Sequence, residues 1–463
     1  MKKLLLFLTI IQCSFLFSQT VLATFPLELK KSKEYKQIVN AENTVTHDIF
    51  VFASDKESLT ILKYNSALFL TNHYTFARPD TSYKLLTGYS FNEQGNPTIY
   101  WSSLDLKNIQ AIRYELNTNT TVIFNYYNSF SQQSIVTPFQ ENNTFYILTQ
   151  KDSEEKLVLY SFKNGQKEQK TVDFSSFKFK NSRNQPLTFS QILEACPIEK
   201  IETNQFNPLF KGTKKTKLYI LKNRLLLTLD HNDNETQTFE IDLATLDIQE
   251  KIFPKTATKN YVCLSNSYYH ESKIYQFKVN ADELLFEIKD YKTADNIKSI
   301  LVSKTDTIPF KSSPLWLQFE GQKPKEFKNT AKFLNQLVHL EVGLAVYKTS
   351  NSILITFGGT GNIQFTDFIN SLSDSNLFNN DLMYRDIPTT VYFESIFDKK
   401  LDRTKKDEDP LAIDFISRFQ QEHPEVSIPS IIRYKNYYIM GYYDAYAKQY
   451  TMRKFIDGFE RDF

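Results

Sequence analysis

A recurring aromatic position, many short apolar strand patterns and a low glycine content predict an all-β chain of the β-propeller type. Five segments place an aromatic residue in an apolar run that ends at a polar turn. These aromatic residues are Tyr64, Tyr114, Tyr160, Phe239 and Phe286. They are 50, 46, 79 and 47 residues apart, and about 45 to 50 residues is the length of one four-stranded blade. We therefore expect about seven blades, with six or eight as alternatives, and short helical insertions.

The expected strands fall into seven groups along the chain. They lie near 47–80, 84–127, 134–174, 217–253, 260–304, 342–397 and 430–462. Polar turns separate the strands, and Asn and Asp tolerate the left-handed conformation that Gly would otherwise supply. This suits a chain with only 11 glycines in 463 residues. Asn164-Gly165 marks a hairpin turn, in a loop expected to be longer than two residues because the flanking strands are placed at 157–160 and 171–174.

Four segments break the strand pattern with apolar residues at helical spacing. They are 187–193, 329–340, 363–372 and 410–419. Each is expected to be a helix packed on the β body and not a separate domain. Insertions are accordingly placed near 175–216, 320–341, 362–387 and 400–425, within one propeller-like domain that spans 24–463.

The N-terminus has the pattern of a secretory signal peptide. Lys2 and Lys3 precede a mainly apolar stretch over 4–17, which is too short to span a bilayer comfortably. We place cleavage after Ala23, so residues 1–23 form the signal peptide, with cleavage after Ser18 as the second choice. An uncleaved anchor is the alternative. A secreted or periplasmic protein is expected, with no transmembrane span once the signal is removed.

Bulk charge excludes one class of partner. The chain has 55 basic and 53 acidic residues, and losing Lys2 and Lys3 leaves 53 of each. Because nothing then draws the protein to a polyanion, no nucleic-acid partner is expected. A protein or glycan partner at the cell envelope is expected instead.

Motifs for catalysis and metal binding are missing from the sequence. The six histidines show no ligand spacing, and there is no G-x-S-x-G nucleophile motif. The acids Asp48, Asp105, Asp242, Asp290 and Glu394 suit strand ends or turns. The run 230–235 is rich in oxygen ligands but lacks the glycine and distant glutamate of a calcium loop, so a polar turn explains it. No catalytic residue, metal or cofactor is assigned.

Two local patterns are candidate binding sites. Gly358, Gly359, Thr360 and Gly361 follow an apolar strand and precede a helix-like segment, an arrangement that can present backbone N–H groups to an anion. A tight exit from a blade strand is the alternative. Tyr438, Tyr442 and Tyr443 belong to a tyrosine-rich stretch that suits a protein or sugar surface. Packing between blades is the alternative for these tyrosines.

Cys196 and Cys263 are the two cysteines that follow the signal peptide. In an exported protein they could form a disulfide that secures the insertion at 175–216. Two buried thiols are the alternative.

The sequence favours an exported, non-catalytic interaction or ligand-binding protein of the cell envelope. This hypothesis rests on the missing catalytic motifs, the aromatic content and the insertions. One alternative is an extracellular enzyme that degrades a polymer such as a glycan, with carboxylates from different blades. Another is a structural subunit of an envelope complex.

Overall fold

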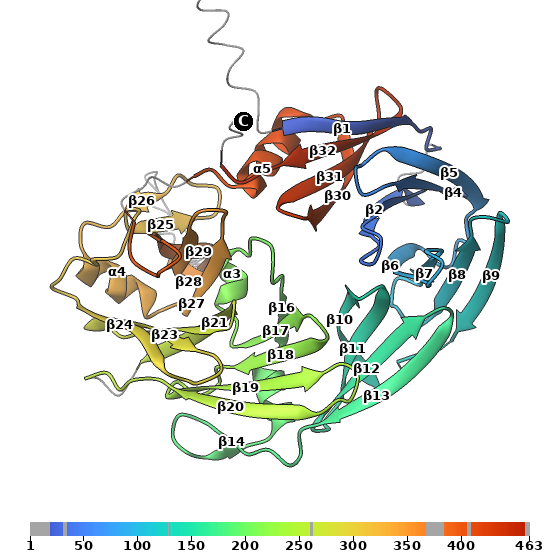
Figure 1. Ribbon diagram of the computed structural model, residues 1–463. Helices are drawn as coiled ribbons and strands as arrows, with labels where there is room; N and C mark the ends of the chain where they lie inside the picture. Colours follow the sequence, from blue (N-terminus) through green and yellow to red (C-terminus); the bar gives the residue numbers. More distant parts are fainter. Residues whose placement is uncertain are drawn as a thin grey trace, which may run out of the picture. The chain divides into compact units, whose positions relative to one another are not determined.

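The computed structural model describes residues 19–30, 35–127, 129–130, 132–259, 263–366, 384–404 and 409–458. The chain divides into two compact units. Unit 1 combines 1–174 with 408–463, and unit 2 consists of 175–407. Each unit is built from successive sheets that are antiparallel except for one parallel pair in unit 2 (Figure 1). The expectation of one domain over 24–463 stays a prediction.

Three four-stranded sheets of unit 1 follow one another in the sequence, each with its strands in chain order. The first contains β2 (Gln37–Glu42), β3 (Ile49–Ser54), β4 (Ser58–Tyr64) and β5 (Leu70–Ala77). The second contains β6 (Leu85–Phe91), β7 (Pro97–Ser102), β8 (Ile109–Glu115) and β9 (Thr120–Tyr126). The third contains β10 (Gln133–Glu141), β11 (Thr144–Lys151), β12 (Lys156–Lys163) and β13 (Gln166–Asp173). This repeated four-stranded meander is the blade that the aromatic spacing predicts.

The fourth sheet of unit 1 joins both ends of the chain. Its strand order is β1-β32-β31-β30, made of β1 (Gln19–Pro26), β30 (Val426–Tyr434), β31 (Tyr437–Asp444) and β32 (Gln449–Phe455). Helix α5 (Ala412–Glu422) precedes β30 and buries Ala412, Ile416 and Phe419 against this sheet. Tyr450 on β32 donates a hydrogen bond of 2.9 Å to Asn40 Oδ1 on β2, so the last sheet is tied to the first.

Unit 2 contains one four-stranded and two five-stranded sheets among its described residues. One has the order β16-β17-β18-β19-β20, from β16 (Ile198–Ile201), β17 (Thr216–Leu221), β18 (Arg224–Leu229), β19 (Glu235–Asp242) and β20 (Ile248–Pro254). The next is β21 (Leu264–His270), β22 (Lys273–Val279), β23 (Glu283–Asp290) and β24 (Asn296–Ser303). The last has the order β26-β25-β29-β28-β27, from β25 (Trp316–Phe319), β26 (Lys325–Glu326), β27 (Glu341–Lys348), β28 (Ile353–Thr366) and β29 (Tyr384–Phe397).

The described chain thus holds seven sheets of four or five strands. This confirms the predicted fold class, a nearly all-β chain of β-propeller type, and matches the expected number of blades. The inner strands are apolar on both faces because they pack between neighbouring sheets. All six residues of β3 are buried, whereas β5 in the same sheet is mostly exposed.

Asparagine supplies many of the turns. Among the described residues, six asparagines have a positive φ, compared with four glycines. At Asn164 and Gly165 φ is 54° and 76°, and Lys163 pairs directly with Gln166. The hairpin loop therefore has two residues, and the expectation of a longer loop is wrong. Both positive angles are those of a tight primed turn, which matches the twist of the flanking strands.

Three of the four expected helices are present. The segments 187–193, 329–340 and 410–419 become α2 (Phe189–Ala195), α4 (Thr330–Leu337) and α5. Thr188 begins α2 with a capping box that includes Gln191, and Asn329 caps α4. The helix expected at 363–372 is wrong for residues 363–366, because these residues continue strand β28. The remainder, 367–372, lies outside the described residues.

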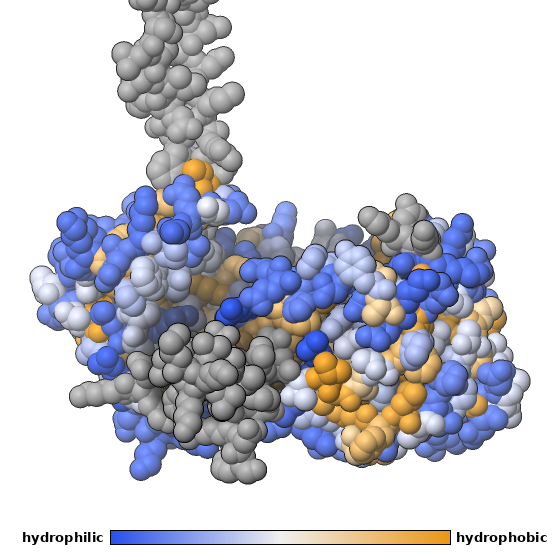
Figure 2. Space-filling view, turned by 90° about the horizontal axis from the view of Figure 1, so that it is seen from above, coloured by the Kyte–Doolittle hydropathy of each residue, from blue (hydrophilic) through white to orange (hydrophobic). Residues whose placement is uncertain are grey.

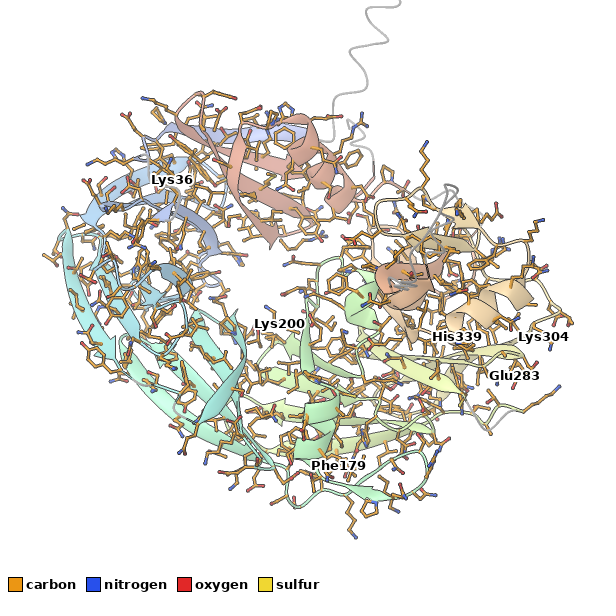
Figure 3. The ribbon with its side chains drawn as sticks, turned by 180° about the vertical axis from the view of Figure 1, so that it is seen from behind. Lys36, Phe179, Lys200, Glu283, Lys304 and His339 are labelled. Carbon is orange, nitrogen blue, oxygen red and sulfur yellow. The ribbon has the colours of Figure 1, made fainter. Side chains whose placement is uncertain are left out.

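A small two-stranded sheet, β14 (Phe179–Lys180) and β15 (Pro186–Leu187), also lies in the predicted insertion 175–216. Phe179, labelled in Figure 3, contacts the rings of Phe189 and Phe239 and so covers the sheet that contains β19. In the part of the chain that the structure describes, no helix has the length and apolar composition needed to cross a bilayer.

Candidate functional site

The glycine-rich segment lies in a strand and not in a loop. Gly358, Gly359, Thr360 and Gly361 belong to the long strand β28. The first three pair in regular register with β27 and β29, and Gly361 pairs with β29. The expected order of strand, glycine loop and helix is therefore wrong. Backbone N–H groups that are used in strand pairing are not presented to an anion. The alternative of a tight exit from the strand is also wrong, because β28 continues to Thr366.

Close backbone approach explains why glycine stands here. A Cβ on Gly358 would lie 2.0 Å from the carbonyl oxygen of Val391. The same holds on β27, where a Cβ on Gly343 would lie 2.4 Å from the carbonyl oxygen of Gly212. Gly212 ends the short helix α3 (Leu209–Gly212), so α3 rests directly on the backbone of β27. This contact fixes where Phe210 of α3 lies.

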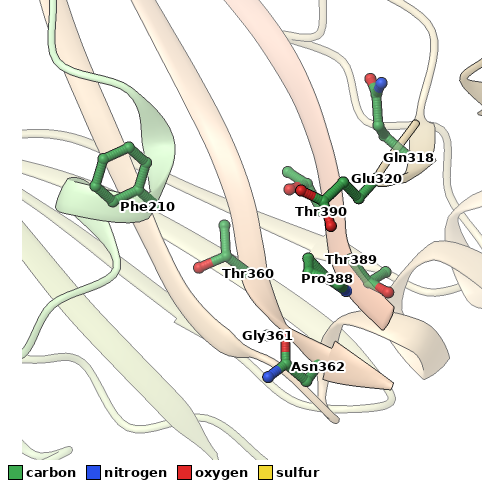
Figure 4. Close-up of a pocket in the computed structure, with 9 residues that line it drawn as sticks. All are labelled: Phe210, Gln318, Glu320, Thr360, Gly361, Asn362, Pro388, Thr389 and Thr390. Carbon is green, nitrogen blue, oxygen red and sulfur yellow. The ribbon is translucent and has the colours of Figure 1, made fainter. Parts of the chain in front are cut away.

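Phe210 borders an open cavity of about 310 Å³ in unit 2 (Figure 4). Strand β28 contributes Thr360, Gly361 and Asn362. The remaining lining residues are Gln318 of β25, Glu320 directly after this strand, and Pro388, Thr389 and Thr390 from β29. In Figure 4 Phe210 lies on one side and Gln318 and Glu320 on the other, with Thr360 between them. Two of the four residues singled out at 358–361, Thr360 and Gly361, thus line a cavity.

The cavity combines an exposed ring with several polar groups. Phe210 is 52% exposed, so its ring is available to a ligand. Thr360 Oγ1 lies 3.1 Å from Thr213 Oγ1, and Thr389 Oγ1 donates to the carbonyl oxygen of Ile387 at 2.9 Å. A hydroxyl oxygen that is held in this way keeps free lone pairs, so it can still accept a hydrogen bond from a ligand. The site can therefore bind a molecule that has one apolar face and several polar edges.

The predicted tyrosine surface is not exposed. Tyr438, Tyr442 and Tyr443 are 3%, 4% and 4% exposed. Tyr438 and Tyr442 pack with α5, and Tyr443 packs in the core that includes Tyr450. The expectation of an exposed patch at these three positions is wrong because alternate tyrosines of β31 face two cores, one on each side of the sheet. Tyr446, in the turn that follows, is 83% exposed.

Cys196 and Cys263 are free and partly buried. The predicted disulfide is therefore not formed in this structure. Burial raises the pKa of the Cys196 thiol, which favours the protonated, less reactive form. The alternative of two buried thiols fits only in part, because both cysteines are partly buried.

The acidic run at 230–235 contains a buried charge cluster and not a calcium loop. Asp230, Lys217 and Lys255 have no exposed side-chain surface. Asp230 Oδ1 lies 2.9 Å from Lys255 Nζ, and Asp230 Oδ2 lies 3.5 Å from Lys217 Nζ. Two lysine ammonium groups thus bind the carboxylate that a calcium ion would need as a ligand. Within the described ranges, no three His, Cys, Asp or Glu side chains are grouped as a metal site.

Hydrogen bonds extend this cluster to the neighbouring sheet. Ser267 on β21 donates to Asp230 Oδ2 from its backbone nitrogen at 3.0 Å and from its hydroxyl at 2.8 Å. Lys217 Nζ donates to Asn266 Oδ1 at 2.5 Å, and Asn266 donates to the carbonyl oxygen of Val342 on β27 at 2.8 Å. The cluster therefore joins three sheets of unit 2 and is structural.

The electrostatics of the cluster follow from burial and pairing. Burial lowers the pKa of Lys217 to about 8, although Asp230 opposes the change. Burial alone would raise the pKa of Asp230, but the ammonium groups of Lys255 and Lys217 hold it well below its usual range. Asp230 is therefore ionised at neutral pH, and its charge balances part of the buried positive charge.

Three of the five acids that were expected at strand ends or turns form turns, whereas Glu394 lies within strand β29. Asp105, Asp242 and Asp290 each accept backbone N–H groups from the residues that follow them. Asp48 pairs with Lys63 at 3.3 Å. These contacts account for the four carboxylates without a catalytic role.

Sequence reasoning missed Phe210, Gln318, Glu320, Asn362 and the threonines of β29. They come from four separate segments that only the folded sheet brings together. The one signal available was Phe210 itself, an aromatic residue between Leu209 and Lys211 in a predicted insertion.

No protein-family model and no curated protein sequence matches the chain. Among solved structures, prolyl oligopeptidase B from Galerina marginata is 8% identical, with a TM-score of 0.30 over 69% of this chain and 46% of that chain. An uncharacterized protein from Listeria monocytogenes is 10% identical, with a TM-score of 0.28 over 94% of this chain and 99% of that one. A variant of AofleA from Arthrobotrys oligospora is 9% identical, with a TM-score of 0.24 over 74% and 83%.

Similarity at this level transfers no activity, substrate or partner. The class of protein is instead defined by the sheets of the chain itself, which make it β-propeller-like. Such a fold is compatible with binding and with enzymatic roles.

Proposed function

We propose that this is an exported protein that binds a ligand without converting it, and that the ligand occupies the cavity beside Phe210. The observation that carries the proposal is the exposed Phe210 ring at the edge of a cavity whose lining includes several polar side chains. Small-molecule sites are concave and combine apolar surface with a few polar groups that fix orientation. A volume of about 310 Å³ is at the lower end of their usual range.

The side chains favour a glycan as the ligand. A sugar ring has an apolar C–H face, which can pack on Phe210, and hydroxyl edges, which hydrogen-bond to hydroxyl, amide and carboxylate groups. The cavity offers these as Thr390, Asn362, Gln318 and Glu320. The cavity is also open, so a longer chain can extend from it.

The same residues favour binding over hydrolysis. Glycoside hydrolysis ordinarily uses two carboxyl groups on either side of the scissile bond. Among the nine described residues that line the cavity, Glu320 is the single carboxylate. Export is supported by Lys2 and Lys3 followed by the apolar stretch at 4–17.

A glycan array followed by titration calorimetry of the strongest glycan tests the proposal. Phe210→Ala removes the ring from an exposed position, so the variant should keep its melting temperature while affinity falls at least about tenfold, or about 1.4 kcal/mol. Phe69→Ala is a matched control, because Phe69 is also exposed, at 71%, but lies in unit 1. It should bind as the unsubstituted protein does.

Two results would overturn the proposal. Binding that is unchanged in Phe210→Ala would show that the ligand binds elsewhere. No binding to any glycan would show that the ligand is not a glycan. Shortened glycan products in the binding mixture would instead support the polymer-degrading enzyme. Stable co-purification with envelope proteins, without glycan binding, would support the structural subunit.

A further inference from the structure

The first strand of the structure lies where the signal peptide was expected to end. Strand β1 covers Gln19–Pro26 and pairs antiparallel with β32. The register runs from Gln19 opposite Phe455 to Pro26 opposite Gln449, with one irregularity between Val21 and Ala23. Because β1 is the edge of its four-stranded sheet, it protects β32 from solvent and from other strands.

Side chains of β1 also contribute to the core of unit 1. Leu22, Ala23 and Phe25 are partly buried and pack against the cluster that contains Tyr450 and Met452. The Phe25 ring lies 5.3 Å from the ring of His73 on β5. Figure 2 shows a mainly hydrophilic surface on which hydrophobic side chains gather in one area.

Cleavage after Ala23 would destroy this strand. It would remove Gln19–Ala23, five of the eight residues of β1, and leave only Thr24, Phe25 and Pro26. On β32, Arg453 and Phe455 would lose their β1 partners Val21 and Gln19 and keep only their pairing with β31. An unpaired strand edge costs hydrogen bonds and invites association.

We infer that the signal peptide ends at Ser18 and that the mature chain begins at Gln19 with its closing strand intact. Ser18 supplies the small residue that a signal peptidase requires at the cleavage position, directly after the apolar stretch. Hydrolysis of the Ser18–Gln19 peptide bond by that peptidase, with water, leaves a carboxyl group on Ser18 and an amino group on Gln19. The inference rests on the export in the proposed function and not on ligand binding.

The pairing also sets an order of assembly. β1 is the first strand made and β32 is the last, so their sheet can close only after the chain has reached Phe455. The mature N-terminus must therefore remain available until export is nearly complete.

Expression of residues 1–463 in a bacterial host with periplasmic export, followed by N-terminal sequencing of the exported protein, tests the inference. We expect Gln19 as the first residue. Thr24 as the first residue would overturn the inference and leave the proposed export intact. Cell-associated protein that keeps residues 1–18 would overturn both.

A substitution separates the two cleavage sites. Ser18→Gln places a large residue at the proposed position, so processing at Gln19 should be lost, whereas cleavage after Ala23 would continue. Independently, chains that start at Gln19 and at Thr24 can be purified without the signal. The longer chain should have the higher melting temperature, and equal melting temperatures would count against a closing role for β1.

Discussion

The carboxylate of Asp230 lies 2.9 Å from the ammonium group of Lys255, and neither side chain is exposed to solvent. A second buried lysine, Lys217, shares the same carboxylate at 3.5 Å. Burying charges is costly unless they are paired and hydrogen-bonded. Here Ser267 and Thr236 complete the hydrogen bonds of Asp230, so the cluster is satisfied and holds neighbouring sheets in place.

Asp230→Ala should destabilise unit 2 severely. The substitution leaves Lys217 and Lys255 buried without a counter-charge, and breaking a buried pair from one side costs about 3–5 kcal/mol. Chemical denaturation measures the loss. Glu271→Gln is the control, because its pair with Lys348 is 50% and 40% exposed and should contribute less than about 1 kcal/mol. A similar small loss for both variants would contradict a buried role for Asp230.

Lowering the pH should reduce the free energy of unfolding already at pH values above those at which most carboxylates titrate. Burial lowers the pKa of His231 and of His270 to about 4, from an ordinary value near 6.5. Between these values the unfolded chain binds more protons than the folded chain, so the free energy of unfolding falls as the pH falls from 6.5 toward 4. Melting temperatures between pH 7 and pH 5 measure this.

Replacing both histidines by Asn should flatten that slope. His339→Asn is the control, because His339 is exposed, and the slope should persist in this variant (Figure 3). An equal slope in the double variant and in the unsubstituted protein would show that other groups cause the acid sensitivity.

Gly343→Ala should displace α3 and reduce ligand binding. Its Cβ would lie 2.4 Å from the carbonyl oxygen of Gly212 and 2.6 Å from Thr213 Cα, and neither backbone atom can rotate away. Overpacking of this kind costs about 1–3 kcal/mol or more. Denaturation and glycan titration should show losses of stability and affinity together.

Gly321→Ala controls for the loss of a glycine. Nothing lies within 4 Å of its added Cβ, although its φ of 71° carries a backbone cost of about 1–2 kcal/mol. It should therefore lower stability slightly and leave affinity unchanged. Unchanged affinity in Gly343→Ala as well would show that the position of α3 does not matter for binding.

Tyr450→Phe should loosen the connection between the first and last sheets of unit 1. The variant keeps the ring but removes the buried hydrogen bond to Asn40, and loss of such a bond costs about 1–3 kcal/mol when the partner stays buried. Tyr446→Phe, at an 83% exposed position, is the matched control and should change stability by less than about 0.5 kcal/mol. Equal stabilities of the two variants would contradict this role.

The repeat of aromatic residues predicted the sheets well because the strands of one blade follow one another along the chain. Each sheet forms mainly from consecutive strands, so strand patterns and turn residues carry most of the information. The helices at α2, α4 and α5 were predicted for the same reason. Strand β1 was not predicted because its apolar residues directly follow those of the signal peptide. In addition, its partner β32 is over 400 residues away in the sequence.

The cavity could not be predicted in the same way. Its residues come from α3, the end of β25, β28 and β29, and only their packing brings them together. The glycines of β28 were conspicuous in the sequence, but a loop and a closely packed strand both favour glycine. Tyr438, Tyr442 and Tyr443 posed the same ambiguity, since alternation along a strand does not reveal whether one or both faces are covered.

The amino-acid sequence by itself determined the β class, the positions of most strands and the asparagine turns, because period-two patterns and backbone preferences act over a few residues. Tertiary structure decided which tyrosines are buried, where Asp230 finds its lysines, which residues surround the cavity beside Phe210, and that β1 closes the last sheet. These outcomes depend on contacts between segments far apart in the chain, and such contacts leave no local pattern in the sequence.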